Sequence, residues 1–287
     1  MAAAASALDS QQLDGELERA LAGLSAALEG EAQPAAAGRA LAVLTLLLSR
    51  AGDGQLPAIH AALPAIHAAL GVDDQLVQAN ACAALTAAAA LDDGLAASVA
   101  ADCTPKLVGL LRSCEGRGGE LQLNVVSALG QLARDQQPAV QAVMQPEALP
   151  CLLRMADASQ PLKLQEAVAD GLCALASHEA ARDALCGAGA VPAAAALLAQ
   201  RGDLGPPQLE VCARALLVLG MLLPGRPPAA AQLAAAPGAL RALLALLRQG
   251  GDVDCRVLAR DVLGQLLKDD ALKPAVEAEL RGGGEAS

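Results

Sequence analysis

The chain has 287 residues and a net charge of −11, and 54% of its residues are hydrophobic although none is Phe, Tyr or Trp. This hydrophobic content excludes a disordered chain, and because alanine and leucine carry most of it, an all-α fold is favoured. The lack of aromatic rings and the negative charge disfavour binding to nucleic acid or to an anionic membrane surface.

Residues 1–34 form an acidic segment that lacks the early basic residue of a secretory or transit signal, and we expect a polar capping helix there. The most apolar run, residues 40–48, is about half as long as a membrane span requires. We therefore expect a soluble, cytoplasmic chain that does not insert into a membrane. The nucleus or another reducing intracellular compartment is the alternative.

A helical segment recurs along most of the chain. One copy is QANACAALTAAAA (78–90), and its echoes share an anchor leucine at positions Leu41, Leu85, Leu129, Leu172, Leu216 and Leu263. The intervals between these leucines are 44, 44, 43, 44 and 47 residues. Such a fixed period predicts a stack of repeats that bury one continuous core.

Two further helices are expected between successive anchor segments. Prolines open the second of them at Pro105, Pro150 and Pro192, where the missing N–H costs nothing. Acidic pairs stand between helices and are interpreted as N-caps in preference to cation sites: Asp73–Asp74, Asp92–Asp93 and Asp269–Asp270. Each repeat is therefore predicted to contain three helices.

A duplicated heptad, LPAIHAALPAIHAALG (56–71), falls where one repeat has its first and second helices. We expect a break at Pro64, because a continuous helix would lose a backbone hydrogen bond there at a cost of about 3 kcal/mol. The break would place His60 and His67 on separate helices. We therefore expect neither histidine to bind a metal.

The repeats resemble the armadillo family. SHEAARDALCGAGAVPAAAALLAQ (177–200) is similar to that family's first two helices, and LVQANACAALTAAAA (76–90) and LQLNVVSALGQLA (121–133) to its third. The resemblance implies a right-handed α-solenoid of three-helix repeats with a period of about 44 residues over 35–270. A C-terminal capping helix and flexible tail are expected over 271–287.

The resemblance also implies a function, the binding of a protein segment in a concave groove lined by third helices. Asn80 and Asn124 match the asparagine that grips the peptide backbone in peptide-binding members of the family. The equivalent positions in later repeats carry Ala167, Val211 and Leu258, so this array is broken. Gln131 and Gln265 occupy a second polar position, and we expect a monomer that binds a helix or extended segment of another protein.

Other residues allow further interpretations. Arg256 and Arg260 lie one turn apart and form either a solvated face or a contact for an acidic partner residue. The eight scattered cysteines form no C-x-x-C pair and favour buried thiols over a metal or disulfide role.

We expect no enzyme activity, no cofactor and no metal, because the single His178–Glu179 pair falls at a turn and no catalytic motif occurs. The alternatives are a nucleotide-exchange cofactor of the 70 kDa heat-shock chaperone and, less favoured, a HEAT-like lyase or a metal hydroxylase.

Overall fold

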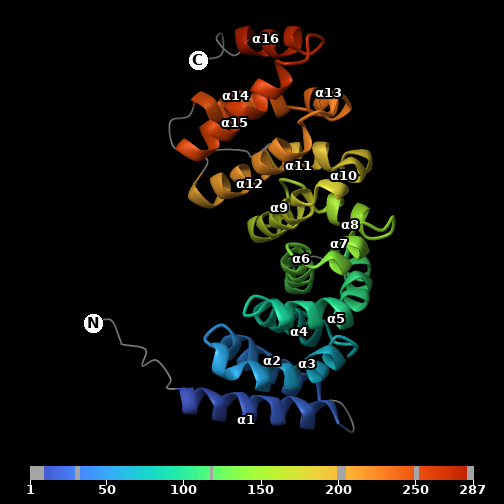
Figure 1. Cartoon of the computed structure of the whole chain (residues 1–287), viewed down its shortest axis with the longest axis vertical. Coiled ribbons are helices and arrows are strands. Elements are labelled where there is room, and N and C mark those ends of the chain that lie inside the picture. Colours follow the sequence, from blue (N-terminus) through green and yellow to red (C-terminus); the bar gives the residue numbers. More distant parts are fainter. Residues whose placement is uncertain (1–9, 30–32, 117–118, 199–204, 249–251, 283–287) are drawn as a thin grey trace, which may run out of the picture. The chain divides into compact units, whose positions relative to one another are not determined.

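A computed structural model describes residues 10–29, 33–116, 119–198, 205–248 and 252–282. Apart from two single 3-10 turns, every element in these ranges is an α-helix, as the composition predicts (Figure 1). Contacts group the chain into two compact units, residues 1–142 (unit 1) and residues 143–287 (unit 2). The capping role of 1–34, a single solenoid over 35–270 and a capping helix within 271–287 stay predictions.

Unit 1 is built on three helices that pack side by side, α2 on α4 and α4 on α6. These helices carry the anchor leucines, and we call them the inner helices of unit 1. The helices of unit 1 are α1 (Ser10–Leu28), α2 (Pro34–Leu48), α3 (Leu56–Ala69), α4 (Gln75–Ala89), α5 (Asp93–Cys114) and α6 (Gly119–Ala133). The outer helices α3 and α5 pack against α4 and against one another, and α1 covers α2 and α3.

The predicted break at Pro64 is wrong, because α3 runs unbroken from Leu56 to Ala69. Pro105 likewise lies inside α5 and does not open a helix. Both prolines are exposed, and so are His60 and Ala101, whose carbonyls lose their hydrogen-bond donors. Water can therefore solvate these carbonyls, which lowers the cost of an interior proline. The repeats that end in α4 and α6 consequently contain two helices where three were predicted.

Unit 2 keeps the predicted three-helix repeat. Its helices are α8 (Leu149–Arg154), α9 (Leu162–Ser177), α10 (Arg182–Ala188), α11 (Ala190–Leu198), α12 (Pro206–Leu222), α13 (Pro227–Ala235), α14 (Ala239–Arg248), α15 (Val253–Leu266) and α16 (Lys273–Gly282), and α7 (Gln137–Val143) precedes them. The inner helices of unit 2 are α9, α12 and α15, of which α12 packs against both others.

Glycines make the corners between the outer helices of unit 2. Gly189 has a φ of 95° and Gly238 a φ of 74°, in the left-handed region that glycine adopts without strain. The chain turns by 79° between α10 and α11 and by 85° between α13 and α14. Pro192 follows one of these corners in the first turn of α11, and Pro150 stands in the first turn of α8, as predicted.

The core confirms the repeat register. All six anchor leucines are buried, with exposed fractions of 5% or less. The predicted N-caps are also present in two cases, because the Asp74 carboxylate accepts from the N–H groups of Leu76 and Val77 and Asp92 caps α5 in the same way. The same repeat register therefore predicts both which leucines are buried and where these two helices are capped.

Helix α5 is long and apolar enough to cross a membrane by length and composition alone, and so are the bent pairs α10–α11 and α13–α14. In the fold, 44% of the most apolar part of α5 is buried, and the helix packs against α3, α4 and α6. Its apolar character thus also serves packing within unit 1. That the chain does not insert into a membrane stays a prediction.

Candidate functional site

The inner helices of unit 1 each present a stripe of exposed or half-buried side chains. Positions one repeat apart stand at the same level of the stripe, with Arg39 of α2 matched by Ala83 and Ser127. One turn further on, Val43 is matched by Ala87 and by Gln131, a residue predicted to contact the partner. We call the surface formed by these stripes the inner-helix face of unit 1.

Asn80 and Asn124, the two asparagines of this face, hold the inner helices together. The Asn80 side chain in α4 donates from Nδ2 to the backbone oxygen of Gly38 in α2, at 2.9 Å. Asn124 in α6 repeats the arrangement one repeat later and donates to the backbone oxygen of Ala79 at 3.0 Å. One amide hydrogen of each asparagine therefore serves the fold, and only the rest of each amide is left for a partner.

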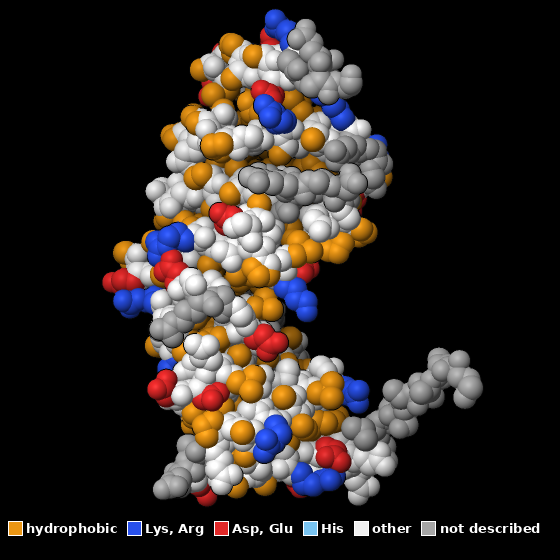
Figure 2. All heavy atoms as spheres, turned by 180° about the vertical axis from the view of Figure 1, so that it is seen from behind, with side chains coloured by type: hydrophobic (Ala, Val, Ile, Leu, Met, Phe, Trp, Pro, Cys, Tyr) orange, Lys and Arg blue, Asp and Glu red, His pale blue; other side chains and the backbone are white. Residues whose placement is uncertain are grey.

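Large aliphatic side chains are exposed on the same face. Val43 and Leu46 of α2 are 48% and 55% exposed, and Leu76 of α4 is 55% exposed. Figure 2 shows hydrophobic side chains at the surface close to lysine or arginine in the lower, N-terminal part of the molecule. These residues were not predicted from the sequence, although Val43 stands two residues after its anchor leucine, where two other repeats carry Gln131 and Gln265.

The corresponding stripes of α9, α12 and α15 form the surface that we call the inner-helix face of unit 2, in which Asp170 and Arg214 match Ser127 of unit 1. This face carries a cluster of charges around Arg214 of α12. Its guanidinium group forms ion pairs with Asp170 at 2.5 Å, with Glu210 at 3.0 Å and with Glu166 at 3.1 Å. Arg214 is only 22% exposed, and three carboxylates around one guanidinium group leave the cluster with a net negative charge. Asp170 and Arg214 lie 44 residues apart, so the repeat interval itself is the signal that would have predicted this contact.

Cysteine thiols, at other positions of the repeat than the asparagines, link the inner helices of unit 2. The Cys173 thiol of α9 donates to the backbone oxygen of Arg214 at 3.3 Å, and the Cys255 thiol of α15 donates to that of Leu209 at 3.3 Å. Thiols are weak donors, so these contacts add less than the amide bonds of unit 1. All eight cysteines are free thiols, and seven of them are buried.

The predicted residues of α15 lie at the surface of unit 2. Arg256 is half-buried and Arg260 is exposed, with its Nε 3.7 Å from the neighbouring Asp261. The Gln265 side chain accepts a hydrogen bond from Lys268 at 3.1 Å. These residues belong to one helix, whereas Asn80, Asn124 and Gln131 belong to unit 1. A role in partner binding stays a prediction for all six.

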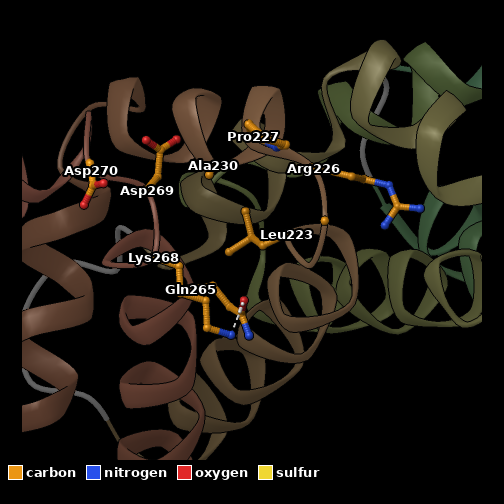
Figure 3. Close-up of a pocket in the computed structure, with 9 residues that line it drawn as sticks. Leu223, Arg226, Pro227, Ala230, Gln265, Lys268, Asp269 and Asp270 are labelled. Carbon is orange, nitrogen blue, oxygen red and sulfur yellow. Dashed lines mark hydrogen bonds between the residues drawn. The ribbon is translucent and has the colours of Figure 1, made fainter.

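A cavity of about 520 Å³ lies in unit 2 between the end of α12 and the end of α15. Gln265 and Lys268 face Leu223 across it, while Arg226 points away (Figure 3) and pairs with Asp183 of α10. Asp269 and Asp270 complete the charged part of the lining, and Asp270 pairs with Lys273. Because Asp270 is already paired, Lys268 and Asp269 are left with opposite charges, and the cavity favours neither an anionic nor a cationic ligand.

No three His, Cys, Asp or Glu side chains come together to hold a metal ion within the described ranges. His60 is exposed and His67 half-buried on the continuous helix α3, and His178 ends α9. The expected lack of a metal, a cofactor and enzyme activity stays a prediction, as does the nucleotide-exchange alternative.

No family model and no curated protein matches the chain. Solved structures do. An engineered protein is 24% identical with a TM-score of 0.71, and covers 88% of this chain and 99% of its own. A designed armadillo repeat protein is 22% identical with a TM-score of 0.69, and covers 88% of this chain and 100% of its own.

Another designed armadillo repeat protein, solved in complex with the peptide (KR)4, is 20% identical with a TM-score of 0.68 and covers 88% of this chain and 99% of its own. Identities this low establish the fold and nothing finer. Together with the buried anchor leucines and the recurrent inner helices, they show that the chain has the all-α fold of armadillo repeats.

Proposed function

We propose that this protein is a non-enzymatic scaffold that binds a segment of another protein on its inner-helix faces. One observation carries the proposal. The large hydrophobic side chains that are exposed in the described ranges all belong to inner helices or to their ends, namely Val43, Leu46, Leu76, Leu217, Val253, Val257 and Leu267. The outer helices expose none within those ranges.

Single exposed hydrophobic residues are common on protein surfaces and need no explanation. Here, however, the exposed hydrophobic residues are restricted to the inner helices and their ends in both units. Packing alone does not explain this restriction, because it would allow such residues on any helix. Apolar surface rimmed by polar groups is typical of protein-binding sites. The polar groups here include Asn80, Gln131 and the Arg214 cluster, which would fix the orientation of a bound segment.

The similarity to a designed protein in complex with the peptide (KR)4 agrees with a segment-binding role. Without aromatic side chains to act as anchors, this chain would bind through aliphatic area and shape. The proposal also places the protein in a reducing intracellular compartment, as the buried free thiols favour.

The test begins with proximity labelling on the intact chain to identify a partner, whose affinity is then measured by isothermal titration calorimetry. Two variants alter the inner-helix faces, Gln131→Arg in unit 1 and Leu217→Arg in unit 2. Two matched controls place the same arginine at exposed positions on outer helices, Ala97→Arg on α5 and Ala231→Arg on α13.

At least one inner-helix variant should weaken the partner about tenfold or more, since a buried arginine without a counter-charge is costly, and both controls should bind as the wild type does. Loss of binding in the controls, with binding intact in both inner-helix variants, would refute the proposal.

A further inference from the structure

One strip of the inner-helix face of unit 1 has an unusual arrangement of charge. Arg39, Val43, Leu46 and Arg50 follow one another along α2 and the turn that extends it, and all four side chains are exposed. The N–H group of Arg50 donates to the backbone oxygen of Leu47, so the chain keeps its helical course to that residue. We call these four residues the α2 strip.

The spacing within the α2 strip is four, three and four residues, which places all four side chains on one side of the helix. The same spacing forms the seam between paired helices in coiled coils. Leu76 of α4 borders the strip, because its Cγ and Cδ2 atoms lie 3.8 Å from the position that a Cβ atom on Gly38 would take. Apolar contact area is therefore present on two adjacent helices.

The two arginines are not neutralised within the fold. Neither Arg39 nor Arg50 forms an ion pair or a side-chain hydrogen bond with any described residue, although the chain has a net charge of −11. Two carboxylates of α1 have other partners, since Glu16 pairs with Arg19 and Asp14 accepts from Gln55. Both cations of the α2 strip are thus open to an acidic group from outside.

From this arrangement we infer that the α2 strip binds an acidic amphipathic helix of a partner protein. The partner helix would carry two carboxylates about 16 Å apart, which is the rise over eleven helical residues. Aliphatic side chains between them would cover Val43, Leu46 and Leu76. The inference rests on the proposed scaffold function and specifies the chemistry of its partner.

Charge complementarity is the reason for choosing an acidic helix over other occupants. A basic segment would bring its charges against Arg39 and Arg50, and a neutral apolar helix would bury both guanidinium groups without a counter-charge. Carboxylates at both ends of an aliphatic stretch match the order basic, apolar, apolar, basic on α2. Helices that lay their apolar face on a groove are a common mode of recognition.

The probe is a synthetic amphipathic helix with two glutamates three turns apart and two leucines between them. A second peptide carries lysines in place of the glutamates, and a third carries alanines in place of the leucines. Fluorescence anisotropy with the intact chain measures the affinity of each peptide. The protein variants are Arg39→Glu, Arg50→Glu and Leu46→Gln, all at exposed positions, so circular dichroism should show unchanged folding.

Two control variants match these changes elsewhere. Arg112→Glu reverses an exposed arginine of α5 that likewise has no ion pair among the described residues, and Ala97→Gln places a glutamine at an exposed position of the same outer helix. Each arginine reversal in the α2 strip should weaken the acidic peptide about fivefold to tenfold at low salt, and Leu46→Gln about fivefold. The two control variants should bind as the wild type does.

Salt provides a second readout. The affinity of the wild type for the acidic peptide should fall as salt screens the attraction. In the variant with both arginines reversed to glutamate the dependence should change sign, because salt then screens a repulsion. The inference is overturned if the lysine peptide binds as tightly as the acidic one, or if Arg112→Glu and Ala97→Gln weaken binding as much as the strip variants. It is also overturned if the wild type self-associates through the α2 strip and Arg39→Glu makes it monomeric.

The two proposals can fail separately. A partner identified by proximity labelling that is sensitive to Gln131→Arg or Leu217→Arg, but binds Arg39→Glu and Arg50→Glu as tightly as the wild type, would leave the scaffold function standing. That result would refute only the acidic helix on the α2 strip.

Discussion

At the scale of single residues, Asn124 faces a solvent-accessible surface and nevertheless serves the fold. Its amide donates to the Ala79 backbone oxygen across the contact between α6 and α4. The spacing of 44 residues between Asn80 and Asn124 was visible in the sequence, but the acceptor was not. A side chain that reaches the backbone of a neighbouring repeat depends on the lateral packing of two helices, which periodicity alone does not specify.

We predict that Asn124→Ala lowers the free energy of unfolding by about 1 kcal/mol, the usual net worth of one hydrogen bond. Urea denaturation followed by circular dichroism measures this change. Ser127→Ala is the matched control, because Ser127 is half-buried on the same helix and its side chain has no hydrogen bond to any residue that the structure describes. Equal stability of the two variants would mean that the Asn124 contact does not hold the helices together.

The thiols yield a second prediction at this scale. Burial raises the pKa of Cys103 and that of Cys212, each to about 11, so the reactive thiolate is scarce at neutral pH. Cys173 is the one cysteine that is not fully buried. Maleimide labelling at pH 7.5, followed by peptide mass spectrometry, should therefore modify Cys173 first.

Labelling in guanidinium chloride is the control for the thiol experiment, and all eight cysteines should react there. In the folded chain, modification of Cys103 or Cys212 as rapid as that of Cys173 would contradict the buried positions of these thiols. An increase in pH towards 11 should speed the labelling of Cys103 and Cys212, because a larger fraction of each thiol is then ionised.

At the scale of helices, the two internal prolines show where local rules were insufficient. Proline predicted the helix starts at Pro150 and Pro192 correctly and the breaks at Pro64 and Pro105 incorrectly. The difference lies in the residues just before the proline, because Gly189, with a φ of 95°, turns the chain before Pro192, whereas no glycine closely precedes Pro64 or Pro105. A proline inside a helix also leaves the carbonyl four residues earlier without its donor. In α3 and α5 that carbonyl belongs to an exposed residue and water can replace the missing donor. The rule that proline opens a helix takes no account of the preceding residues, so it could not distinguish the two cases.

Because α3 is continuous, Pro64→Ala should restore a hydrogen bond to the His60 backbone oxygen. We predict a gain of about 1–2 kcal/mol in the free energy of unfolding. The gain is smaller than the full cost of an interior proline, because removing the proline also makes the unfolded chain more flexible and so stabilises the unfolded state. Thermal unfolding followed by circular dichroism measures the change. Pro57→Ala is the control, because Pro57 stands in the first turn of α3 and should be nearly neutral.

A loss of stability in Pro64→Ala, or a gain of equal size in Pro57→Ala, would argue for a helix break at Pro64. The contrast between the two prolines matters here, because they occupy the same position in the duplicated heptad. Their sequence surroundings are almost identical, and only their place in the helix differs.

At the scale of the whole molecule, the period of about 44 residues made the fold predictable. The anchor leucines predicted both the repeat and its core, because a leucine that recurs at one position of a stacked helix has to be buried. The binding residues were less predictable. Val43, Leu46 and Leu76 stand out because their side chains are exposed. The residue type alone does not tell whether a valine or leucine is buried or exposed.

Hydrogen exchange with mass spectrometry, recorded for the intact chain with and without saturating partner, tests most directly whether the inner-helix faces bind. Bound partner should slow exchange in α2, α4 and α6 of unit 1 or in α9, α12 and α15 of unit 2, by about tenfold at ten times the dissociation constant. The outer helices α3, α5, α10, α11, α13 and α14 should change little. Protection confined to these outer helices would contradict binding on the inner-helix faces.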